Sequence, residues 1–135
     1  MAIEYVRFQS AVPDQHGHFK GVFGLVNNLG RSGRLTEEQE RFRRENNAWF
    51  DAAYTDPSTV DASVYDPEVN PGAVAWFKPT AVHLIDRVEG YLEILSAHDV
   101  ACHRVTSADP GQVVYEDDVQ IVVVPQTASM PQTSE

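Results

Sequence analysis

Three Asx-Pro pairs between residues 55 and 72 constrain the fold more than any other feature of this chain. The pairs are Asp56-Pro57, Asp66-Pro67 and Asn70-Pro71. Proline lacks the amide hydrogen that helices and central strands need, and it drives the residue before it toward an extended conformation. We therefore expect a long Asp-Pro-rich loop over 55–72 without regular structure. Loops of this length are usually functional or mobile.

Length and composition place the rest of the chain in one domain. The chain has 135 residues, of which 42% are hydrophobic and 22% are charged, as in soluble globular proteins. We expect one domain over 1–125 and a disordered polar tail over 126–135. The sequence shows no apolar run long enough for a membrane span and no secretory signal pattern, which predicts a cytoplasmic protein.

The N-terminal part reads as one strand and two helices. Strand-forming residue types cover 3–9, and apolar residues recur at helical spacing over 19–29. Gly30 stands where a left-handed helix end is expected. Thr36 followed by Gln39 has the capping-box pattern of a second helix start.

The C-terminal part reads as strands around a third helix. We expect strands over 73–77 and 100–105, a helix between them that is N-capped by Thr80, and a hairpin made of 113–115 and 119–124. A strand, a helix and a second strand in this order favour a parallel β-α-β unit. The sequence therefore predicts an α+β fold in the order β-α-α-β-α-β-β, with one parallel β-α-β unit and a C-terminal hairpin.

The charge is unevenly distributed. The net charge is −10, and residues 1–50 hold seven basic and six acidic side chains against three basic and fourteen acidic ones in 51–135. A strongly acidic field disfavours binding to nucleic acid or to anionic membranes. It favours a basic protein partner, or it serves solubility alone.

Two polar clusters are candidates for a ligand site. Lys78 and Thr80 lie between a predicted strand and a predicted helix start, where unpaired amide groups attract anions. Adjacent carboxylates near Glu116 can differ in pKa and act as acid and base. We take Lys78 and Glu116 as the candidate catalytic residues, and the candidate ligand-binding residues are Lys78, Thr80, Tyr115, Glu116 and Gln120.

The sequence gives little support for other chemistry. The acidic residues of 55–72 lack the spacing of a calcium loop, and no histidine pair has helical metal-ligand spacing. Cys102 lies in a predicted strand among apolar neighbours, which is typical of an inert thiol. Glycine-rich phosphate loops and the Gly-x-Ser-x-Gly elbow are missing. We expect no metal and no cofactor.

One pattern resembles a known group of sequences. Trp76-Phe77-Lys78, a Leu/Ile-rich helix and Pro110-Gly111-x-Val113-Val114-Tyr115-Glu116-Asp117-x-x-Gln120 are similar to small bacterial proteins with no activity known to us. The opening Ile3-Glu4-Tyr5-Val6-Arg7-Phe8 is similar to theirs as well. The resemblance spans 1–125 and implies no function.

Three functions remain open at this point. The leading hypothesis is a binding or regulatory module without self-contained catalytic machinery, for example an acidic antitoxin or immunity-type protein. The alternative is a small enzyme or ligand-binding protein with an anion pocket near Lys78/Thr80 and Glu116/Gln120. A homodimer is the third, and exposure of the aromatic side chains Trp49, Phe50, Tyr54 and Tyr65 would favour it.

Overall fold

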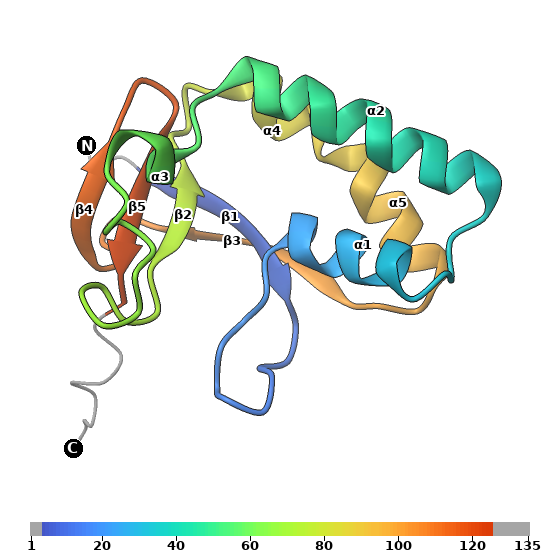
Figure 1. The fold of residues 1–135 in the computed structure, drawn as a ribbon, viewed down its shortest axis with the longest axis horizontal. Helices are drawn as coiled ribbons and strands as arrows, with labels where there is room; N and C mark the ends of the chain where they lie inside the picture. Colours follow the sequence, from blue (N-terminus) through green and yellow to red (C-terminus); the bar gives the residue numbers. More distant parts are fainter. Residues whose placement is uncertain (1–3, 126–135) are drawn as a thin grey trace. The chain divides into compact units, whose positions relative to one another are not determined.

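The computed structural model describes residues 4–125, so the predicted tail over 126–135 lies outside the described residues. The elements are β1 (Tyr5–Ser10), α1 (Val22–Arg31), α2 (Glu37–Ala53), α3 (Pro57–Val60), β2 (Val74–Phe77), α4 (Val82–Arg87), α5 (Glu89–Ala97), β3 (Cys102–Ser107), β4 (Gln112–Glu116) and β5 (Gln120–Val124) (Figure 1). Helices and a sheet of five strands confirm the predicted α+β class, but the order of elements is β-α-α-α-β-α-α-β-β-β and not the predicted β-α-α-β-α-β-β.

The chain divides into two compact units. Unit 1 consists, among the described residues, of 4–6, 55–81 and 106–125, and unit 2 consists of 7–54 and 82–105. Strands β1 and β3 each run from one unit into the other. Unit 1 holds β2, α3, β4 and β5, whereas unit 2 holds α1, α2, α4 and α5.

Unit 1 is built on antiparallel pairing. β2 pairs with β5 from Val74↔Val123 to Phe77↔Gln120, and β5 pairs with β4 in the predicted C-terminal hairpin. The ladder between β4 and β5 is irregular between Val113 and Tyr115, as expected for a β-bulge. Residues on both faces of β5 are buried, which agrees with its unbroken apolar run.

The predicted parallel β-α-β unit is wrong. The strand order is β3-β1-β2-β5-β4, so β1 stands between β2 and β3. β2 pairs antiparallel with β1 through Val6↔Phe77 and antiparallel with β5. The order of elements along the chain suggested that β2 and β3 were neighbours, but an earlier strand can occupy the place between them.

The Asp-Pro segment is more regular than predicted. Asp56 caps a single helical turn, α3, because its carboxylate accepts a hydrogen bond from the Ser58 amide at 2.9 Å. Asp61 and Asp66 each accept from the amide two residues ahead in the same way. These aspartates stand five residues apart, so the segment is a series of short turns that each begin with a carboxylate.

Unit 2 gathers its aromatic side chains between three helices. Tyr91 of α5 is fully buried and packs edge-on against Phe23 of α1 and Phe42 of α2, with ring centroids 5.2 and 5.3 Å apart. Phe50 closes the cluster against Phe23 at 4.8 Å. The predicted capping box of α2 is present, with both hydrogen bonds between Thr36 and Gln39. None of the helices in residues 4–125 combines the length and the apolar composition needed to cross a membrane.

Two helix ends differ from the prediction. α1 continues past Gly30, and the left-handed residue is Gly33 instead, with a φ of +72°. The single helix expected after Thr80 is divided at Val88 into α4 and α5, and α4 begins only at Val82, so Thr80 is not its N-cap. Asp99, two residues beyond the end of α5, adopts the left-handed conformation with a φ of +58°.

Replacing two glycines by alanine should change the stability of the protein in opposite directions. Gly111, with a φ of +153°, has no room for a Cβ, which would collide with the Val124 carbonyl oxygen. We expect Gly111→Ala to lower the free energy of unfolding by about 2 kcal/mol. Gly24 lies inside α1 with open space around it, so Gly24→Ala should raise that free energy by about 0.5–1 kcal/mol. Urea unfolding measures both free energies, and equal effects of the two changes would contradict the close contact described at Gly111.

Candidate binding site

An ion pair in unit 1 joins two residues that the sequence had singled out. Lys78 follows β2 and Glu116 ends β4, and Lys78 Nζ lies 2.7 Å from Glu116 Oε2. The hydrogen bond from this ammonium to Glu116 raises the pKa of Lys78 above its ordinary value. Any external anion that binds to Lys78 must therefore compete with Glu116.

Asp117 organises the turn between β4 and β5. Its carboxylate accepts four hydrogen bonds, from the amides of Val119 and Gln120, the Tyr115 hydroxyl and the Gln120 side-chain amide. Burial raises the pKa of Asp117, but these hydrogen bonds outweigh burial and lower it overall. Asp117 is not among the site residues predicted from the sequence, although an aspartate just before a turn is a common acceptor for the amides that follow.

Gln120 connects this turn to the Asp-Pro segment. The side chain is only 2% exposed, and its Nε2 donates to the Thr55 carbonyl at 2.8 Å and to Asp117 at 3.0 Å. Both amide hydrogens are used in this way. Gln120 thus fixes the start of the segment to the sheet.

The predicted site residues divide between the two faces of the sheet. Paired residues of neighbouring strands share a face, so Glu116, Ile121 and Trp76 lie on one face. Gln120 pairs with Phe77 and lies on the other face, where it meets Tyr115 through Asp117. The structure brings Lys78 and Glu116 together in an ion pair, and it links Tyr115 to Gln120 through Asp117 on the opposite face. Thr80 is exposed and lies two residues beyond Lys78.

Trp76 presents a donor that sequence reasoning missed. Its indole Nε1 is buried and has no hydrogen-bond partner in the structure. Leaving such a donor unpaired costs about 1–3 kcal/mol. Trp76 shares its face with Glu116, which is the side of the sheet that also carries the ion pair with Lys78.

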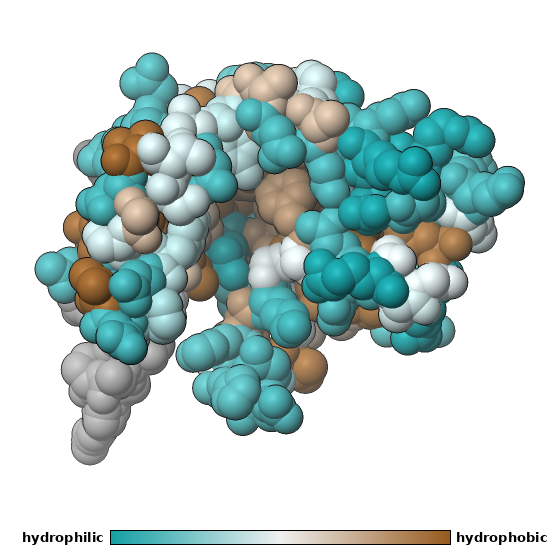
Figure 2. Space-filling view, in the orientation of Figure 1, coloured by the Kyte–Doolittle hydropathy of each residue, from teal (hydrophilic) through white to brown (hydrophobic). Residues whose placement is uncertain are grey.

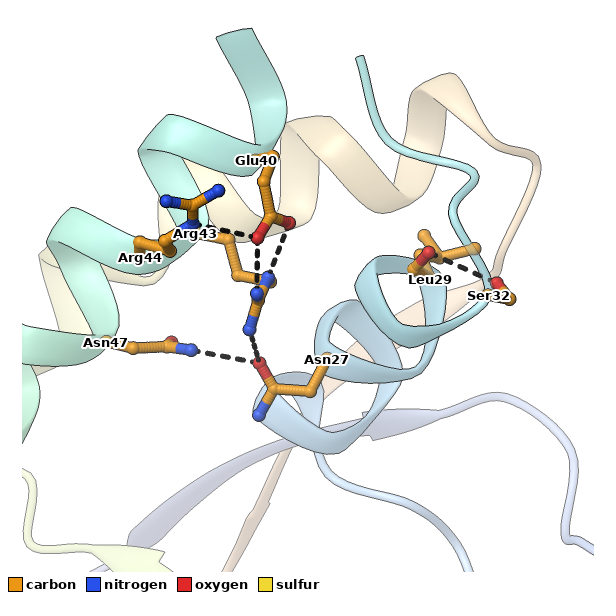
Figure 3. Close-up of polar contacts among 7 residues, drawn as sticks. All are labelled: Asn27, Leu29, Ser32, Glu40, Arg43, Arg44 and Asn47. Atoms are coloured by element: carbon orange, nitrogen blue, oxygen red, sulfur yellow. Dashed lines mark hydrogen bonds and ion pairs between the residues drawn. The ribbon is translucent and has the colours of Figure 1, made fainter. Parts of the chain in front are cut away.

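Two basic residues of α2, Arg43 and Arg44, take part in a structural network. Glu40 lies 2.5 Å from Arg43 and 3.0 Å from Arg44, and these hydrogen bonds lower the pKa of Glu40 to about 2 (Figure 3). Arg43 also donates to Asn27 of α1, and Asn27 accepts from Asn47 as well. The same figure shows Ser32 bonded back to the Leu29 carbonyl at the end of α1. Arg43 therefore ties α1 to α2.

Two further side chains that could be reactive, Cys102 and His98, belong to unit 2. Burial raises the pKa of the Cys102 thiol, and the opposite effect of Arg7 is smaller. The thiol is therefore protonated at neutral pH. His98 is bonded to Gln39 at 3.0 Å. Within residues 4–125, no three His, Cys, Asp or Glu side chains are arranged to hold a metal ion.

The two units differ sharply in charge. The described residues of unit 1 carry nine carboxylates and a single basic side chain, Lys78, which is already paired with Glu116. Unit 2 is nearly balanced, with ten carboxylates and nine Arg or Lys side chains. Almost the whole net charge of the chain therefore belongs to unit 1.

Comparisons with protein-family models, with curated proteins and with solved structures find no match to this chain.

We expect Asp117→Asn to lower the free energy of unfolding at pH 7 by about 1–3 kcal/mol, because a neutral amide cannot accept from all four donors. The pKa of Asp117 is lower in the folded state, so its contribution is complete above about pH 5 and is lost as the pH falls through the folded pKa. Urea unfolding from pH 7 to pH 3 should show the difference between wild type and variant shrinking.

The exposed neighbour Asp118 provides the control, since it shares the turn without these bonds. Asp118→Asn should leave the free energy of unfolding within about 0.5 kcal/mol of wild type. A constant difference between wild type and Asp117→Asn across the pH range would contradict the role of the ionised carboxylate.

Proposed function

We propose that the protein is a binding module that recognises a basic protein partner through unit 1 and carries no self-contained catalytic machinery. The observation that carries this proposal is the concentration of charge in unit 1, nine carboxylates against one paired lysine. A one-signed surface attracts an oppositely charged partner over distances comparable to the Debye length and speeds its association. The same field opposes binding to nucleic acid phosphates.

Several carboxylates of unit 1 already accept hydrogen bonds within the protein, which supports a role in binding over a role in proton transfer. Asp117 is held ionised by four donors, and the turn-forming aspartates accept from their own backbone. A general base must accept a proton from its substrate, and its pKa must lie near the working pH. The acidic residues of unit 1 therefore fit a role as fixed charges better than the role of a general base.

The test begins with native mass spectrometry of the tagged chain isolated gently from its source cells, at low and at high salt. A stoichiometric basic protein that dissociates at high salt is expected. Its association rate, measured by stopped flow, should fall at least about tenfold between low and high ionic strength. A partner whose association ignores salt, or no protein partner, would overturn the proposal.

Matched neutralised variants locate the effect. We expect the triple variant of Glu68→Gln, Asp109→Asn and Asp118→Asn in unit 1 to slow association several-fold at low salt, because it removes three exposed charges from the proposed surface. The control changes three exposed carboxylates of unit 2 by the same total charge: Glu38→Gln, Glu45→Gln and Asp86→Asn. Equal slowing by both variants would show that net charge, and not unit 1, governs association.

A second candidate function is favoured by one observation, the unpaired Nε1 of Trp76 on the face that carries the ion pair of Lys78 and Glu116. An indole donor and an ammonium group suit a small anion that presents more than one acceptor oxygen. In this alternative, Lys78 exchanges Glu116 for the ligand, and Glu116 serves as the base if the site is catalytic.

Titration with inorganic phosphate and with acetate tests this alternative. We expect the Trp76 indole proton resonance to shift on binding while that of Trp49 stays constant, and Lys78→Ala with Glu116→Ala should abolish the shift. The melting temperature should change little, because partly exposed ion pairs contribute at most about 1 kcal/mol. An unmoved Trp76 resonance, or loss of the fold in the double variant, would remove this candidate.

A further inference from the structure

Exposed hydrophobic side chains gather in the Asp-Pro segment of unit 1. Seven large hydrophobic residues are exposed in the described chain, and three of them, Val60, Tyr65 and Val69, lie within ten residues. Their exposed fractions are 65%, 40% and 57%. Figure 2 shows hydrophobic atoms interspersed with hydrophilic ones on the side of unit 1 where α3 lies. Single exposed apolar residues are common on protein surfaces, whereas several within one short segment make that segment a candidate interaction site.

The segment holds these side chains in a fixed arrangement. Val64 is 1% exposed and anchors the middle of the segment in the core of unit 1. Asn70 Nδ2 donates to the carbonyls of Ser63 and Val64, and Gln120 holds the start of the segment at Thr55. A surface that is ordered before binding loses less conformational entropy when a partner docks.

The charge of the segment determines which partner fits it. Residues 55–77 contain no Lys, Arg or His side chain, whereas Asp56, Asp61, Asp66 and Glu68 are acidic. Hydrogen bonds from the Ser63 hydroxyl and amide lower the pKa of Asp61, so it stays ionised down to acid pH. A complementary partner must therefore be basic around an apolar centre.

We propose that the segment 56–70 is the docking surface of unit 1, and that it takes a basic protein face on which Lys or Arg side chains surround aliphatic ones. This inference rests on the proposed function and names the contact that function uses. Val60 and Val69 supply the apolar contact, and the aspartates between them supply the charge. The hydrophobic contact gives affinity that salt does not screen, while the carboxylates give the association rate.

Two synthetic peptides of equal charge test the inference on the full chain. One is an amphipathic peptide of Lys and Leu, and in the other every Leu is replaced by Ser. Calorimetry at fixed ionic strength should show the Lys/Leu peptide binding about tenfold more tightly than the Lys/Ser peptide. Val60→Ser with Val69→Ser should reduce this preference to within about twofold, because the aliphatic contact is removed while every charge stays.

The control is Val12→Ser with Val113→Ser, which removes two other exposed valines, 68% and 48% exposed, outside the segment. It should keep the full preference, and melting temperatures should show both double variants folded. Equal loss in both variants, or an undiminished preference in Val60→Ser with Val69→Ser, overturns the inference. If the Lys/Ser peptide fails to bind even at low salt, the proposed function fails as well, whereas salt-sensitive binding of both peptides without preference overturns the docking surface alone.

Discussion

The carboxylate of Asp117 is the point on which unit 1 depends. It satisfies two turn amides, the Tyr115 hydroxyl and the Gln120 side chain, and the Gln120 side chain holds Thr55. One charged group therefore closes the β4–β5 hairpin and, through one intermediate, positions the start of the Asp-Pro segment. Charge-assisted hydrogen bonds are about twice as strong as neutral ones, which suits an acceptor that serves several donors. The ordered segment that we propose as a docking surface begins at this network.

The second constraint on unit 1 is the repulsion among its own carboxylates. Nine negative groups beside one lysine destabilise a compact state, and the structure offsets this locally. Asp56, Asp61 and Asp66 each accept an amide two residues ahead, so their charges are stabilised by backbone dipoles. Unit 2 uses ordinary ion pairs instead, as with Glu40 between Arg43 and Arg44. Backbone amides stabilise these carboxylates without adding a positive side chain, so unit 1 keeps its negative charge, whereas arginines neutralise Glu40 in unit 2.

Local features of this fold were predictable from sequence, and long-range ones were not. The capping box at Thr36 and the C-terminal hairpin follow from contacts within a few residues. The predicted parallel unit failed because strand order depends on where β1 inserts, which no local pattern records. The site showed the same division. Neighbouring residues of a strand lie on opposite faces, so the sequence alone places Tyr115 and Glu116 on different faces of β4. The sequence grouped Glu116 with Gln120, but in the β4–β5 register Glu116 pairs with Ile121 and therefore lies on the face opposite to Gln120. The predicted hairpin strands place Asp117 in the connection between them, but its four hydrogen-bond donors come together only in the folded hairpin.

The geometry also gives the pattern Tyr115-x-Asp117-x-x-Gln120 a structural role. Tyr115 and Gln120 both donate to Asp117, and the three residues lie in one hairpin turn. A pattern of tyrosine, aspartate and glutamine invites a catalytic interpretation, because each residue type occurs in active sites. Here the Tyr115 hydroxyl donates to Asp117, the Gln120 side-chain nitrogen donates to Asp117 and Thr55, and Gln120 is almost fully buried. Such a set stabilises a turn and positions the segment attached to it, so it explains how the proposed docking surface would be held in place.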